Sequence, residues 1–215
     1  MTSCCRAGPC EQMFKPRVAR RSLRRYRKKG LDPLERRMVE SAVEGGLEGA
    51  RVLEIGGGIG AIQTELLEAG AERGEVVELV SAYEPYAREL ARERGFEERT
   101  SFRIADVLDG PGTVEPAEVV VMNRVVCCSP DGIQLTAAAA RLARRTLVFS
   151  FPRDTVLLRA GLGLLNGGLW LMRRSFRVFV HSRDALVAAA EAEGLRLEDS
   201  GRGLAWEFAA LRRAK

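Results

Sequence analysis

A glycine-rich segment directly follows a short apolar run and could hold a small molecule close to the backbone. The run Arg51 to Ile55 (RVLEI) continues into GGGIG, which supplies Gly56, Gly57, Gly58 and Gly60. Glycine has no Cβ, so a ligand can approach its backbone without collision. Nicotinamide-binding domains use GxGxxG to bind a pyrophosphate, but here the third glycine comes one residue early and Glu54 precedes the first. A ligand with a positive charge therefore fits this segment better than a phosphate.

Polar side chains also follow the next three apolar runs. Glu78, before Leu79, ends the second run and can accept hydrogen bonds from both hydroxyls of a ribose. Asp106, before Val107, follows the third and is placed to accept from an adenine amino group. Asn123 ends the fourth. The alternative interpretation is that these acids only cap helices or loops.

These segments resemble a known family of enzymes. VLEIGGGIG, Glu78 and the segment IAD, Ile104 to Asp106, are similar to motifs I, II and III of class I S-adenosylmethionine-dependent methyltransferases. The resemblance implies S-adenosyl-L-methionine as cofactor, with its aminoacyl ammonium near Glu54. The cofactor-binding residues it implies are Glu54, Gly56, Gly57, Gly58, Gly60, Glu78, Leu79, Asp106, Val107 and Asn123.

A weaker similarity concerns the acceptor of the methyl group. The N-terminal arm, the segment VVCCSPD and an apolar insert resemble the small bacterial branch around magnesium-protoporphyrin O-methyltransferase. This resemblance implies methyl transfer to a flat, apolar molecule that carries an acid. The fourth run ends in Asn123-Arg124-Val125-Val126 rather than the Asn/Asp-Pro-Pro-Tyr/Phe of amino-methyltransferases, which disfavours a nucleobase amine or a glutamine amide.

Methyl transfer needs in-line alignment and, for a neutral acceptor, removal of one proton. His181, the only histidine, follows the insert, and histidine is the residue type that most often serves as a general base. Tyr26 in the arm is the competing catalytic candidate. Either side chain could instead be purely structural, and an acceptor carboxylate would need no base.

The five cysteines leave two interpretations open. Cys4, Cys5 and Cys10 lie near the N-terminus, and Cys127 and Cys128 lie where the fourth run ends. Thiols meeting at the site could bind a soft metal or a metalloid and support a thiol-dependent metalloid methyltransferase. Their spacing matches no metal signature, and cysteine is also a common small core residue. We therefore predict no metal site.

The order of the elements predicts an α/β fold. Strands are expected at 51–55, 74–77, 101–104, 119–122 and 146–151, with intervening helices, and this alternation gives a doubly wound parallel sheet. Capping boxes are expected at Asp32–Glu35 and Ser81–Glu84. A closing antiparallel hairpin (195–199 and 204–211) completes a mostly parallel, Rossmann-like sheet of seven strands, as the resemblance implies.

Residues 1–30 form a basic arm, and residues 31–215 form the methyltransferase domain with an apolar insert at about 155–174. Residues 1 to 29 contain ten Lys or Arg and one acid, while Ala19, Leu23 and Tyr26 form an apolar stripe. The arm is expected to close the site and to face an acidic acceptor or an anionic membrane. The alternative is an RNA-binding methyltransferase or RNA-binding module that uses the basic arm. The insert is expected to be a helical lid that presents Leu162, Leu165, Leu169 and Trp170. The start lacks the apolar region of a secretory signal, which favours the cytoplasm.

Overall fold

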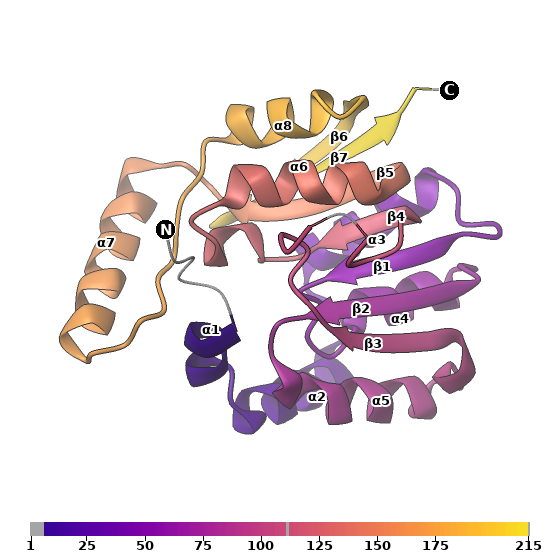
Figure 1. Cartoon of the computed structure of the whole chain (residues 1–215), viewed down its shortest axis with the longest axis horizontal. Helices are drawn as coiled ribbons and strands as arrows, with labels where there is room; N and C mark the ends of the chain where they lie inside the picture. The colour runs from indigo at the N-terminus through magenta and orange to yellow at the C-terminus, as the bar shows by residue number, and fades with distance from the viewer. Residues whose placement is uncertain (1–6, 111, 215) are drawn as a thin grey trace.

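The computed structural model describes residues 7–110 and 112–214, and the side chains from Cys10 onward. It contains a seven-stranded sheet in the order β3-β2-β1-β4-β5-β7-β6 (Figure 1). Five strands run parallel, and β7 pairs antiparallel with both β5 and β6. This confirms the predicted α/β class and the closing hairpin.

The strands follow the apolar runs of the sequence, and some are longer than predicted. They are β1 (Arg51–Ile55), β2 (Arg73–Glu78), β3 (Thr100–Ile104), β4 (Ala117–Met122), β5 (Ala143–Pro152), β6 (Leu195–Arg202) and β7 (Trp206–Arg213). The order along the chain reverses between β1 and β4, which lie side by side. In open α/β sheets a ligand binds beyond the carboxyl ends of the strands at such a reversal.

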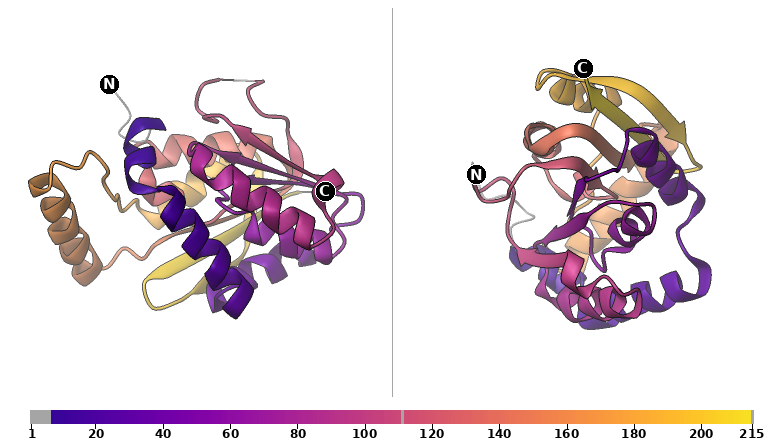
Figure 2. Two further views of the ribbon diagram at one scale, coloured as in Figure 1. Left: turned by 90° about the horizontal axis from the view of Figure 1, so that it is seen from below. Right: turned by 90° about the vertical axis from the view of Figure 1, so that its right-hand side faces the viewer.

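Helices cover both faces of the sheet (Figures 1 and 2). The helices are α1 (Ala7–Met13), α2 (Pro16–Lys29), α3 (Pro33–Glu44), α4 (Ala61–Glu68), α5 (Glu84–Glu93), α6 (Gly132–Leu142), α7 (Val156–Leu171) and α8 (Arg183–Glu191), with short 3-10 turns at Ser81–Tyr83, Glu97–Arg99 and Val126–Cys128. Two apolar clusters form the core. One joins α2, α3, α4 and α5 to the sheet, and the other joins α6 and α8 to its opposite face.

The basic arm packs on the domain through its apolar stripe. Ala19, Leu23 and Tyr26 are buried, while the arginines between them point outward. Arg27 pairs with Glu89 and Glu93 of α5 across this contact. The arm is thus part of the same packed body from α2 onward.

One of the two predicted capping boxes is present. The Asp32 carboxylate accepts from the backbone of Leu34 and Glu35, and the Glu35 carboxylate accepts from Asp32 N at 2.7 Å. The box predicted at Ser81 is wrong. Residues 81–83 form a 3-10 turn, so α5 begins only at Glu84, with no side-chain cap. The turn moves Ser81 too far from the helix start to serve as its cap.

The apolar insert forms α7, which stands apart from the sheet in two views (Figures 1 and 2). Of its residues only Leu169 is buried. In the described part of the chain no helix is long and apolar enough to cross a bilayer.

Candidate functional site

A cavity of about 410 Å³ opens at the carboxyl ends of β1, β2, β3 and β4. This volume lies in the usual range for small-molecule sites. Every cofactor-binding candidate but Gly60 lines it: Glu54, Gly56, Gly57, Gly58, Glu78, Leu79, Asp106, Val107 and Asn123. Gly60 begins α4 and borders a smaller pocket behind the loop. The sheet thus brings segments from four strands to one cavity.

The glycine loop has a backbone that other residues would strain. Gly56 and Gly58 have φ of 64° and 57°, in the left-handed region. A Cβ at Gly56 would lie 2.5 Å from a methyl group of Val125, and one at Gly58 would lie 3.3 Å from the ring of Tyr83. These positions therefore require glycine, because a side chain there would collide with the residues packed around the loop.

Glu54 is a buried acid beneath this loop. Its Oε2 accepts from the backbone of Gln63 in α4 at 2.9 Å, and only 2% of the residue is exposed. The pKa of this carboxyl is raised to about 8, mainly by burial and less by the nearby carboxylates of Glu35 and Glu78, although the hydrogen bond from Gln63 opposes the shift. Such a group gains most from a cationic ligand, whose charge would favour its ionised form.

Glu78 is fixed between two segments of backbone. Its Oε2 accepts from Gly58 N at 3.1 Å, and its Oε1 accepts from Leu79 N at 2.8 Å. Burial raises the pKa of Glu78, although these hydrogen bonds oppose the shift. A carboxylate oxygen has two lone-pair sites, so Oε2 can also accept from a ligand hydroxyl. Asp106 accepts from Leu108 N at 2.9 Å and lines the same cavity.

A charged cluster that the sequence did not reveal closes the cavity beside α3. Asn123 donates to Glu35 Oε1 at 3.0 Å, and Arg124 Nη2 lies 2.5 Å from Asp32 Oδ2. Ser150 accepts from Arg124 N and donates to the Asn123 side chain, each at 2.8 Å. Arg124 has φ 59°, a conformation that costs energy in a side-chain-bearing residue. The sequence signalled Asp32 and Glu35 only as a helix cap.

The arm forms one wall of the cavity. Its lining residues are Cys10, Phe14, Val18, Ser22, Arg25 and Tyr26. Phe14 also packs edge-on against Phe176, which follows α7, with ring centroids 5.7 Å apart. The site is thus bounded by the sheet, the arm and α3. No residue of α7 lines it, so the structure shows the predicted helix but not the lid, and that role stays a prediction.

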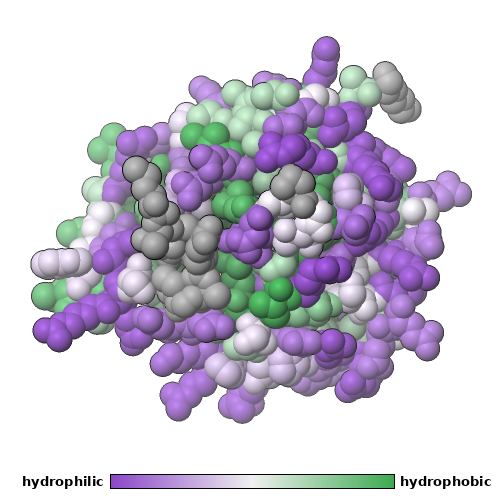
Figure 3. Space-filling model, in the orientation of Figure 1, coloured by the Kyte–Doolittle hydropathy of each residue, from purple (hydrophilic) through white to green (hydrophobic). Residues whose placement is uncertain are grey.

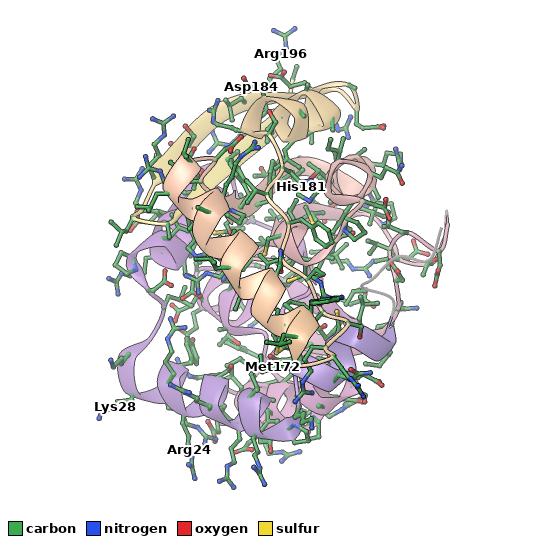
Figure 4. All side chains as sticks on the ribbon, turned by 90° about the vertical axis from the view of Figure 1, so that its left-hand side faces the viewer. Arg24, Lys28, Met172, His181, Asp184 and Arg196 are labelled. Carbon is green, nitrogen blue, oxygen red and sulfur yellow. The ribbon has the colours of Figure 1, made fainter. Side chains whose placement is uncertain are left out.

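The two catalytic candidates are both engaged elsewhere. The Tyr26 hydroxyl donates to Glu65 Oε1 at 2.7 Å, and burial with this carboxylate raises the pKa of Tyr26. The Nε2 of His181 lies 2.9 Å from the carbonyl of Ser129, to which it can only donate, and its ring stacks on Phe179. His181 sits in the segment after α7 (Figure 4) and does not line the cavity. Tyr26 lines the cavity and His181 does not, and the catalytic role of either side chain stays a prediction.

Two of the five cysteines line the cavity, and two others lie outside the residues that the structure describes. Cys4 and Cys5 lie outside the described residues. Cys10 and Cys128 line the cavity, and the sulfurs of Cys127 and Cys128 are 3.8 Å apart. Cys127 Sγ also lies 3.4 Å from the carbonyl of Arg124. Within residues 7–110 and 112–214 no group of three side chains is arranged to hold a metal ion.

The fold is similar to that of solved S-adenosylmethionine-dependent methyltransferases. A solved structure with this fold is magnesium protoporphyrin IX methyltransferase from Synechocystis PCC 6803 with bound SAH, with a TM-score of 0.73 and 17% identity, over 97% of this chain and 99% of that one. An O-methyltransferase family 2 protein from Planctomyces limnophilus DSM 3776, in complex with apigenin, has a TM-score of 0.66 and 16% identity, over 93% of this chain and 62% of that one. The structure of the [4+2]-cyclase SpnF has a TM-score of 0.62 and 14% identity, over 84% of this chain and 80% of that one. No protein-family model and no curated protein matches this sequence.

Proposed function

We propose that this protein is an S-adenosylmethionine-dependent methyltransferase that methylates an oxygen or carbon of an apolar, acid-bearing small molecule. One observation carries the proposal. Glu54, the glycine loop, Glu78 and Asp106 come from three strand ends and line a single cavity. The fold by itself does not fix the reaction, since a similar structure belongs to a cyclase. The residues of the cavity must therefore support the choice of ligand.

The donors and acceptors of the cavity fit S-adenosylmethionine. Buried Glu54 offers a carboxylate to the aminoacyl ammonium, and the glycine loop presents backbone without side chains to the cavity. Glu78 offers oxygens to the ribose hydroxyls, and Asp106 is the acceptor for the adenine amino group. The bound cofactor supplies a methyl group on a good leaving group. The task left to this chain is to orient the acceptor and to exclude water.

The state of the two candidate bases favours an acceptor that is already ionised. The Tyr26 hydroxyl donates to Glu65, and His181, which does not line the cavity, donates to the carbonyl of Ser129. A carboxylate or an acidic hydroxyl needs no proton removed by the protein. The lining of the cavity also includes Phe14, Val18 and Leu135, which offer apolar contact to an acceptor. An apolar molecule with one acidic oxygen satisfies both conditions.

The test starts with purified protein and S-adenosylmethionine labelled at its methyl group. Calorimetry measures cofactor binding, and transfer of label is measured to three acceptor sets: aromatic and fatty carboxylic acids, bulk RNA, and arsenite. We expect label on an organic acid. Label on RNA would favour the RNA-binding alternative, and label on arsenite with loss after thiol blocking would favour the metalloid alternative. Absence of cofactor binding would overturn the proposal.

A further inference from the structure

Helix α7 exposes an apolar surface that the rest of the domain does not cover. The exposed fractions of Leu157, Leu164 and Leu171 are 85%, 80% and 77%, and that of Trp170 is 71%. Apolar residues occur at the left edge of the surface, where α7 lies (Figure 3). Isolated exposed apolar residues are ordinary, but a whole helix of them marks an interaction site.

This helix is apolar on the side that faces the body and also on the side that faces away from it. Leu169 is buried against the body, and Asn166 on the same side donates to Val178 O at 2.8 Å and accepts from Val178 N at 2.9 Å. Leu157, Leu164 and Leu171 are spaced seven residues apart and therefore share the outward face. A surface helix normally turns one apolar face to the core and a polar face to water. Here a second apolar face is directed at the surroundings.

The charges around this face are mostly positive. From residue 155 to residue 183 the chain contains no acid, while Arg173 and Arg174 directly follow the helix and are exposed. Arg159 is paired with Asp154 at the start of the helix. The arm adds cations at the lower edge of the view in Figure 4, where Arg24 and Lys28 point away from the body. An apolar face bordered by arginines complements a surface that is apolar inside and anionic outside.

We propose that α7 binds the surface of an anionic membrane, with its apolar face in the headgroup region. Its 16 residues rise about 24 Å, less than the roughly 30 Å of a bilayer core, so the helix would lie along the membrane instead of crossing it. Trp170 is a residue type that favours this interface, and the arginines contact lipid phosphates. The proposal does not depend on which reaction the cavity performs.

The contacts of α7 connect this surface to the cavity. Asn166 holds Val178, and two residues earlier Phe176 packs against Phe14 of the cavity wall. Membrane contact would therefore place the arm side of the cavity next to the lipid, where an apolar molecule could enter. Two alternatives to the membrane are that this face packs against a second copy of this chain or against the mouth of the cavity. The unmatched arginines favour lipid over a second copy, which would present the same positive charges.

The experiment uses the full chain and vesicles of phosphatidylcholine, alone or mixed with phosphatidylserine. We expect the protein to sediment with the mixed vesicles, less so at high salt, and to show a blue shift of tryptophan emission. The chain has two tryptophans, so Trp170→Phe should remove the shift while Trp206 remains. The paired change Leu164→Gln and Leu171→Gln should weaken vesicle binding about tenfold or more, since two large apolar groups no longer enter the membrane.

A matched control is present at the turn between β6 and β7. Leu204 is 97% exposed, so Leu204→Gln removes an equally exposed leucine outside α7 and should leave vesicle binding unchanged. Arg173→Gln should lower affinity for the anionic vesicles about fivefold, with no effect on neutral ones. Binding that is absent, or that survives the paired leucine change, would overturn the proposal. The proposal would also be overturned if the original protein formed a stable dimer and did not bind vesicles, and if the paired leucine change converted that dimer to a monomer.

Discussion

The carboxylate of Glu78 accepts a hydrogen bond from the backbone N–H of Gly58 at 3.1 Å. This contact joins the end of β2 to the glycine loop after β1, two segments that are twenty residues apart. The loop and the acid are therefore held in a fixed relation before any ligand arrives. A ligand that meets a preformed site loses less affinity to ordering of the protein.

Replacing Glu78 by alanine tests its role in binding the cofactor. The change removes a charged acceptor, and such a hydrogen bond is worth about 1.5 to 3 kcal/mol. Calorimetry should show affinity for S-adenosylmethionine lowered about tenfold or more. Glu84→Ala is the control, because Glu84 starts α5 and does not line the cavity. Equal affinities of the Glu78 variant and the original protein would remove Glu78 from the site.

Gly58→Ala tests the need for a bare backbone in the loop. With φ at 57° the added Cβ costs about 1 to 2 kcal/mol of stability and meets the ring of Tyr83. We expect a lower melting temperature together with loss of cofactor affinity. Gly95→Ala carries the same backbone strain at φ 72° with open space around it, far from the cavity. The Gly95 variant should lose stability but keep its affinity for the cofactor. If both variants lost cofactor affinity to a similar extent, backbone strain alone would explain the loss in Gly58→Ala.

The sheet could be predicted from sequence because its strands are short apolar runs with clear ends. Arg51 to Ile55 ends at glycines, and the run before Glu78 ends at that acid, so the positions of Glu54 and Glu78 followed from local pattern. Parallel strands place their carboxyl ends together, which made one shared site predictable. The helix start at Asp32 followed in the same way, from a capping box that acts within four residues.

The contacts that were missed all join segments far apart in the chain. Arg124 meets Asp32 across ninety-two positions, and Ser150 joins Asn123 across twenty-seven, so no local pattern could indicate them. His181 seemed a candidate base because it is unique and follows the insert, but its partner Ser129 lies fifty-two residues away. The apolar pattern of the insert predicted a helix, yet composition alone could not show which face is turned outward.

Glu54 should make cofactor binding release a proton. Its pKa is about 8 in the empty cavity, so at neutral pH the carboxyl is largely protonated, and a bound cation would lower that pKa. Calorimetry in buffers of different ionisation enthalpy should detect the proton, and affinity should rise as pH increases toward 8. Glu54→Gln should abolish both effects and weaken binding. Glu48→Gln, a change at an exposed residue outside the cavity, should leave them as they are.

The same carboxyl should make the protein without ligand less stable as pH rises. Its pKa is higher in the folded state than its ordinary value of 4.5, so the folded form holds a proton that the unfolded form has lost. Its stabilising contribution is full below pH 4.5 and declines until about pH 8. The melting temperature of Glu54→Gln relative to the original protein should therefore increase across this interval. A constant difference would mean that Glu54 is ionised in the empty cavity.

Tyr26→Phe separates packing from chemistry in the arm. The hydroxyl donates to Glu65 and the ring lies under Arg94, so its loss should cost about 1 to 2 kcal/mol of stability by leaving the Glu65 carboxylate without this donor. The raised pKa of Tyr26 keeps the hydroxyl protonated, so turnover and its pH profile should stay unchanged at a temperature where both proteins are folded. Tyr86→Phe, in α5 and outside the cavity, controls for the loss of a tyrosine hydroxyl and should leave turnover the same. Proton transfer by a positioned side chain contributes about 10² to 10⁴ in rate. If turnover fell a hundredfold or more with Tyr26→Phe, beyond the effect of Tyr86→Phe, Tyr26 would be the general base.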